Sequence, residues 1–161
     1  PVFSSAHDRD SVTRRRHLLP IIEKHAVDLV LQGHDHTYAR GRSQVPVRIG
    51  RRSGELLQTM FVNSISGAKQ YSFKADRWEE YAGDGVELVR AGQNTQFYQI
   101  VRIDGERLEY QAYTAAGELY DDFVVRKNER GEKRVAAGAT ATNDEREFDN
   151  TGRYPGVVDL R

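Results

Sequence analysis

The sequence contains no cysteine, no excess of charge of either sign and no long apolar run. Without Cys it has no thiol nucleophile, disulfide framework or Cys-based zinc site, so any metal it binds must use nitrogen and oxygen ligands. Its 24 Lys and Arg residues balance its 24 Asp and Glu residues. A neutral chain lacks the broad positive field that non-specific binding to nucleic acids or anionic membranes needs. We therefore expect neither a nucleic acid nor a membrane among its partners.

A length of 161 residues suits one domain with a sizeable core. The opening residues Pro1-Val2-Phe3 are apolar and look like the end of a buried strand more than a start or a targeting signal. We therefore expect the chain to be cut from a longer polypeptide. From residue 128 onward the composition becomes polar and Gly-rich, which predicts a poorly packed or extended tail over residues 128–161.

The apolar pattern predicts a helix followed by a buried strand. Leu18, Leu19 and Ile22 recur at helical spacing after Asp10 or Ser11, either of which can cap a helix over residues 11–26. Pro20 should kink this helix or begin a second segment. The apolar run of residues 27–31 follows, as in a strand covered on both faces.

Later segments indicate strands joined by loops. The Asp104-Gly105 pair between alternating runs is a strong signal for a hairpin. Ser64 to Gly67 resembles a turn that returns the chain to the sheet edge where the strand of residues 27–31 ends. The expected segments are a loop over 41–55 with a short strand near 45–49, a strand over 57–65, irregular or short helical structure over 68–85, and an antiparallel meander over 96–103, 107–113 and 119–127.

The Gly33-His34-Asp35-His36 tetrad is the most informative motif for function. In an extended loop, residues two apart project to the same side, so His34 and His36 can converge while Asp35 points away. Neutral imidazole is a common metal ligand, and open sheets place their sites outside the carboxyl ends of strands. A pair of surface or hydrogen-bonded histidines is an equally good interpretation of these residue types alone.

Further ligands are not obvious. A catalytic metal usually has three protein ligands and a two-metal site needs more. His7 and Asp8 follow the opening segment and could reach the same edge, although a solvent-exposed or capping role is the simpler interpretation of His7. The Arg14-Arg15-Arg16 run fans out around the helix axis, which favours a solvated face over a phosphate site.

The run from Val27 to Arg40, with its Gly-His-x-His followed by Tyr and Arg, resembles the last metal-binding motif of the calcineurin-like metallophosphoesterases, particularly their purple acid phosphatase-like branch. The opening Pro1 to Ser5 resembles the segment after an earlier metal-binding His of that family. Ser64 to Tyr71 and Phe97 to Arg126 resemble its C-terminal portion. The resemblance spans roughly residues 1–127.

This resemblance implies a dinuclear metal centre that hydrolyses phosphate esters by attack of a metal-bound hydroxide. His34 and His36 would each bind a different divalent or trivalent ion of the Fe, Zn or Mn class. His7 lies near the place of the family's catalytic His, and Arg9 would contact the phosphate of the substrate. The branch is often exported or periplasmic, so the resemblance also implies that location.

The family's upstream motifs, Asp-x-His, Gly-Asp-x-x-Asp and Gly-Asn-His-Glu or Asp, do not occur in these residues. We therefore expect an α/β (α+β) fold that is half of a metallophosphoesterase two-sheet sandwich, with a flanking helix and a C-terminal antiparallel meander. Residues 1–127 would be the C-terminal part of the catalytic domain. The fragment alone is expected to be inactive, to need the missing N-terminal half of its own domain as a partner, and to self-associate without it.

Two other functions fit parts of the sequence. An amidohydrolase-type metal-dependent hydrolase also uses His-x-His at a strand end, but repeated βα units should follow that motif, whereas antiparallel strands are predicted here. A non-catalytic β-rich binding module would carry His34 and His36 incidentally. Metal analysis separates the module from the enzymes.

Overall fold

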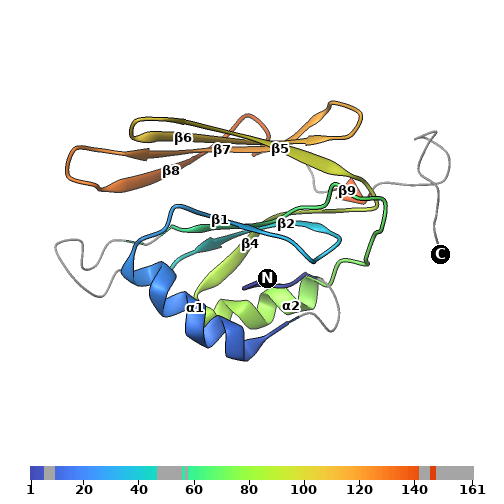
Figure 1. The fold of residues 1–161 in the computed structure, drawn as a ribbon, viewed down its shortest axis with the longest axis horizontal. Coiled ribbons are helices and arrows are strands. Elements are labelled where there is room, and N and C mark those ends of the chain that lie inside the picture. Colours follow the sequence, from blue (N-terminus) through green and yellow to red (C-terminus); the bar gives the residue numbers. More distant parts are fainter. Residues whose placement is uncertain (6–9, 47–55, 57, 142–145, 148–161) are drawn as a thin grey trace.

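The computed structural model describes residues 1–5, 10–46, 56, 58–141 and 146–147, and shows a mixed α/β fold in three layers (Figure 1). Helices form one outer layer, a five-stranded sheet the middle layer, and a four-stranded sheet the other outer layer. In spatial order the middle sheet contains β1 (Leu29–Gln32), β3 (Met60–Asn63), β2 (Tyr38–Ser43), β4 (Val86–Gln93) and β9 (Arg146–Glu147). The outer sheet contains β5 (Phe97–Asp104), β6 (Arg107–Thr114), β7 (Leu119–Lys127) and β8 (Lys133–Ala137).

The predicted first helix is confirmed as α1 (Val12–Lys24). Ser11 is its N-cap, because its hydroxyl accepts a hydrogen bond of 3.2 Å from the Arg14 amide. Pro20 lies inside the helix and begins no separate segment. Leu19 and Ile22 pack against the core between α1 and the middle sheet.

The strand expected over 27–31 forms as β1 and pairs in parallel with β3, which confirms the strand expected over 57–65. The prediction that β1 is covered on both faces holds in part, since Leu29 packs on the core between the sheets and Val30 on the core between the middle sheet and the helices. Among the described strands β1 lies at an edge of its sheet, with β3 on one side, and Leu31 is 60% exposed. A short apolar run does not distinguish a central strand from an edge strand.

The loop expected over 41–55 is wrong for its first residues, since β2 extends to Ser43 and pairs antiparallel with β3 and with β4, a strand that the sequence analysis did not predict. Position 41 of β2 requires glycine because the Trp78 ring packs on it. A Cβ there would lie 2.3 Å from Trp78 Cζ3. For the short strand expected near 45–49, residues 47–49 lie outside the described part, and Pro46 forms an isolated bridge with Leu56.

The short helical structure expected over 68–85 is confirmed by α2 (Ala75–Tyr81) and the 3-10 helix η1 (Ala82–Asp84). The predicted meander is also confirmed, as β5, β6 and β7. Its first turn consists of Gly105 and Glu106, one residue later than expected, because Asp104 still pairs with Arg107. Gly105 supplies the positive φ of this turn, +54°.

Part of the segment expected to be a tail belongs to the outer sheet. Lys133–Ala137 form β8, which pairs antiparallel with β7. Beyond it, the Thr140 hydroxyl donates a 2.6 Å hydrogen bond to the Asp122 carboxylate at the end of the same sheet. Residues 148–161 lie outside the described part of the chain.

Two apolar cores hold the three layers together. One lies between the sheets and includes Tyr38, Phe97 and Tyr110, while the other lies between the middle sheet and the helices and includes Phe3 and Trp78. No helix among the described residues is long and apolar enough to span a membrane.

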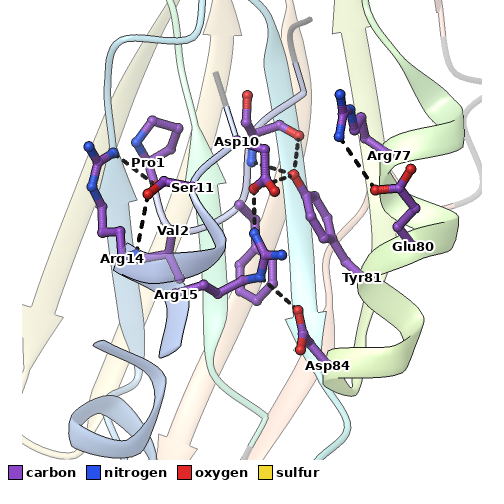
Figure 2. A network of polar contacts seen from close by, with 12 residues as sticks. Pro1, Val2, Asp10, Ser11, Arg14, Arg15, Arg77, Glu80, Tyr81 and Asp84 are labelled. Atoms are coloured by element: carbon purple, nitrogen blue, oxygen red, sulfur yellow. Dashed lines mark hydrogen bonds and ion pairs between the residues drawn. The ribbon is translucent and has the colours of Figure 1, made fainter. Parts of the chain in front are cut away.

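The prediction that Arg14, Arg15 and Arg16 form a solvated face is wrong for Arg15. Arg14 and Arg16 are exposed, but the Arg15 side chain extends from α1 toward Tyr81 of α2 and is buried there (Figure 2). Its guanidinium forms ion pairs with Asp10 and with Asp84, the latter at 2.7 Å. Burial alone would lower the pKa of Arg15, yet the two carboxylates raise it above its ordinary value. A run of three Arg residues does not reveal which one the tertiary structure buries.

The Tyr81 hydroxyl extends this network to the start of the chain. It donates to the Asp10 carboxylate at 3.0 Å (Figure 2). It also lies 3.0 Å from the Ser4 carbonyl oxygen. Arg15 also lies 4.8 Å from the centre of the Tyr81 ring, within the range of a cation–π contact. The network therefore holds residues 1–5 against the helices, and so fixes the segment that contacts the candidate site.

Asp28, just before β1, links the two sheets by ion pairs. These pairs should make the stability of the fold sensitive to acid. Its carboxylate pairs with Lys127 at 2.6 Å and with Lys133 at 3.1 Å. Burial alone would raise the pKa of Asp28, but the two Lys side chains lower it below its ordinary value. Such a carboxylate stabilises the fold above its unfolded-state pKa, and this stabilisation is lost as the pH falls through the lower folded-state pKa.

We expect the free energy of unfolding to decrease as the pH falls below about 4, and Asp28→Asn to flatten this decrease. Urea denaturation at a series of pH values measures both effects. Asp104→Asn, which changes an exposed carboxylate at the β5–β6 turn, is the matched control and should keep the wild-type slope. Equal slopes for Asp28→Asn and the wild type would contradict the assigned role of Asp28.

Candidate functional site

The His34-Asp35-His36 segment follows β1 at the carboxyl end of the parallel β1–β3 pair. Burial alternates along it: His34 is exposed, Asp35 is 2% exposed and His36 is half-buried. Asp35 is thus separated from the two flanking histidines, as predicted, but the backbone at His34 is not extended as that prediction assumed. The backbone of His34 lies in the left-handed region with φ +78°, a conformation that a non-Gly residue adopts only where its surroundings impose it.

Asp35 is held by a buried network of hydrogen bonds. Its carboxylate accepts from the Ser4 hydroxyl at 3.0 Å, from the Ser5 amide, and from the Asn63 side-chain amide at 3.2 Å. The same Asn63 nitrogen donates to the Phe3 carbonyl at 2.9 Å. Asp35 thus connects the loop after β1 to the opening segment and to the last residue of β3.

Ser5 carries the network on to the helical layer. Its hydroxyl accepts a 3.0 Å hydrogen bond from the Trp78 indole N–H of α2. The carboxyl ends of β1 and β3, residues 1–5 and α2 therefore meet at one polar cluster beneath the His34–His36 loop. Because these groups are buried, each hydrogen bond restricts the position of the loop more than an exposed one would.

His36 is oriented by the segment that follows β3. Its Nδ1 lies 2.8 Å from the Lys69 carbonyl oxygen, so Nδ1 carries the proton and donates. The Tyr71 amide donates to the His36 carbonyl at 2.9 Å, and the two rings are 4.6 Å apart. These contacts confirm that the chain after Ser64 returns to the edge that carries His34 and His36.

Because Nδ1 donates to a carbonyl, Nε2 is the His36 nitrogen left to bind a metal, as in a metal-ligating imidazole whose other nitrogen is so engaged. The chemistry of the donor set fits a metal at this position. Within the described residues, however, no group of three or more His, Asp or Glu side chains is placed to hold a metal ion.

The other predicted site residues cannot be placed. His7 and Arg9, expected to act in catalysis and in substrate binding, lie outside the described residues, as does Asp8.

His17, on α1, is exposed, and its Nδ1 donates to the Thr13 carbonyl at 2.7 Å. This contact lies within α1.

Ser4, Ser5 and Asn63 are features of the site that sequence reasoning missed. The two serines sit in the opening segment that resembles the family, and Asn63 ends the apolar strand β3 with a polar residue. A polar residue at the carboxyl end of a parallel strand, level with the motif on the neighbouring strand, was the available signal for Asn63. Its pairing with Asp35 depends on the β1–β3 register, in which Gln32 lies opposite Asn63.

The sequence matches no protein-family model, and searches of curated proteins and of solved structures find nothing similar to it. The function must therefore be inferred from the residues and their arrangement.

Proposed function

We propose that this chain is the C-terminal part of a dinuclear-metal phosphoesterase domain, in which His34 and His36 each bind one metal ion. The observation that carries the proposal is the His36 hydrogen bond to the Lys69 carbonyl, which leaves Nε2 as the acceptor nitrogen. When bound, two metal ions supply Lewis acidity toward phosphoryl oxygens and lower the pKa of a coordinated water. The remaining ligands would come from polypeptide that precedes Pro1.

The role of this chain's own residues is to position the ligands. Asp35 and its partners hold the loop, and the Lys69 carbonyl keeps the His36 proton on Nδ1. A ligand set fixed before the metal arrives loses less conformational entropy on binding. Phosphate esters are the proposed substrates, and His7 and Arg9 keep their proposed roles in catalysis and phosphate binding.

Exposed apolar side chains on the inner faces of the two sheets support the proposal that further polypeptide completes the fold. Leu31 on β1 shares a face with Leu29, which packs on the core between the sheets, and Val101 and Ile103 on β5 share a face with the buried Phe97. These three inward-facing side chains are nevertheless exposed, by 60%, 36% and 72%. Further polypeptide packed on these side chains would cover them, and self-association is the expected alternative in its absence.

The strand that follows the motif argues against the amidohydrolase alternative. Residues after His36 enter β2, which runs antiparallel to β3 and to β4. The repeated βα units of a parallel barrel would place a helix and then another parallel strand there. The architecture therefore favours the phosphoesterase among the two metal-dependent hydrolases.

Hydrolysis assays on the full-length protein test the proposal. We expect it to hydrolyse p-nitrophenyl phosphate or bis(p-nitrophenyl) phosphate, to lose this activity on treatment with a chelator, and to regain it with Mn²⁺, Zn²⁺ or iron. The 161-residue chain should be inactive under the same conditions. A full-length protein inactive on both esters would contradict the phosphoesterase assignment, whereas a fully active 161-residue chain would contradict the division of ligands.

A further inference from the structure

We infer that Asp35 is the positioning residue of the proposed metal site, and that its buried negative charge strengthens the binding of a cation by His34 and His36. This inference rests on the proposed function, since it assigns a role toward a metal held by these two histidines. Asp35 itself is not a ligand in this account, because its oxygens are occupied by the donors beneath the loop.

The first support is geometric. Asp35 is the one residue of the loop that faces inward, and its two oxygens accept from Ser4, Ser5 and Asn63. These donors come from the opening segment and from β3, so the carboxylate ties the loop to two independent parts of the fold. With Asp35 buried, His34 on one side of it is exposed and His36 on the other is half-buried.

The second support is electrostatic. The three hydrogen-bond donors to Asp35 are neutral, and the Pro1 ammonium interacts electrostatically with its carboxylate. The other deeply buried carboxylate, Asp121, is paired with Arg40. A nearby positive charge is attracted more strongly by a buried carboxylate than by an exposed one, because water screens the attraction less. A cation held by the two flanking imidazoles supplies such a charge.

Zinc binding to the 161-residue chain tests this role without any activity assay. Isothermal titration calorimetry with Zn²⁺ alone would compare the wild type, Asp35→Asn and a His34→Ala/His36→Ala double variant. Asp35→Asn keeps the shape of the side chain and removes its charge, and we expect it to raise the Kd for Zn²⁺ by about tenfold or more. Asp104→Asn removes the same charge from an exposed turn and should leave the Kd unchanged.

Two further measurements separate positioning from a general loss of structure. The ¹⁵N chemical shifts of His36 report whether the proton stays on Nδ1, and thermal melting reports whether the variant is folded. Ser4→Ala keeps the carboxylate charge and removes one of its donors, so it should raise the Kd in the same direction by a smaller factor. If Asp35→Asn does not fold, Ser4→Ala still tests whether the hydrogen bonds to Asp35 affect zinc binding.

The outcomes are distinct. A higher Kd in Asp35→Asn with unchanged His36 shifts supports the inference. An unchanged Kd in Asp35→Asn, while the double His variant loses binding, overturns the role of Asp35 and leaves the metal site standing. Wild-type binding no stronger than that of the double His variant overturns this inference, whereas the proposed function is contradicted separately, by a full-length protein that hydrolyses neither ester.

Discussion

Asp121→Asn is expected to lower the free energy of unfolding by about 3–5 kcal/mol, the usual cost of removing one partner of a buried ion pair. Asp121 is 1% exposed and accepts from Arg40 Nε at 2.6 Å and from Arg40 Nη2 at 2.7 Å. Arg40 lies on β2 and Asp121 on β7, so this bidentate pair joins the two sheets. Asn would leave the Arg40 charge buried without a counterion.

Tyr38 makes the substitution more costly. Burial raises the pKa of its hydroxyl well above the ordinary value, so the hydroxyl stays protonated and donates to Asp121 at 2.7 Å. Its oxygen also lies 3.2 Å from the Tyr110 hydroxyl. An Asn at position 121 has one oxygen to serve donors that the carboxylate serves with two. Urea denaturation monitored by circular dichroism would measure the loss.

A second ion pair on β2 is the matched control. Arg42 pairs with Glu87 between β2 and β4, but these side chains are 33% and 45% exposed, far more than those of the buried pair. Glu87→Gln should therefore cost less than about 1 kcal/mol. Replacing Arg40 and Asp121 together by apolar residues of similar size should recover much of the stability lost in Asp121→Asn. Equal losses for Asp121→Asn and Glu87→Gln would refute the assigned role of the buried pair.

His36→Ala is expected to reduce hydrolysis of p-nitrophenyl phosphate by the full-length protein by more than about a hundredfold, since loss of an outer-shell partner alone costs 10–100-fold. The His36 ring is proposed to bind one of the two metal ions, and Ala offers no donor atom. His34→Ala should have a similar effect because the other ion depends on it. Initial rates at saturating metal would measure both variants.

His17→Ala is the control for these variants, because His17 is an exposed imidazole on α1 whose ring donates to a main-chain carbonyl, as that of His36 does. It should keep wild-type rates. Full activity in both His34→Ala and His36→Ala would show that the motif is incidental, as in a non-catalytic β-rich module.

Local sequence pattern predicted the elements whose signals are local. The cap at Ser11 and the periodic Leu19 and Ile22 predicted α1, and the alternating runs around Gly105 predicted the meander. It failed for β4, whose Val86–Gln93 sequence mixes charged and small residues and becomes a strand by pairing with β2. It also failed to predict β8, a polar strand that depends on β7.

In the candidate site, too, features with local sequence signals were predicted and those that depend on tertiary contacts were not. The spacing of His34 and His36 after an apolar strand predicted the loop and the inward position of Asp35. The residues that hold the loop were not predictable, because Ser4, Asn63 and Lys69 reach it through tertiary contacts across 28 or more positions of sequence. The burial of Arg15, with partners 5 and 69 residues away, has the same origin.

Metal positions in a crystal of the full-length protein test the central claim most directly. Anomalous diffraction should locate two ions, one bound by His34 and the other by His36 through Nε2, with the Lys69 carbonyl still accepting from Nδ1. Crystals grown with added Zn²⁺ or Mn²⁺ that show no anomalous signal at either imidazole would contradict the account.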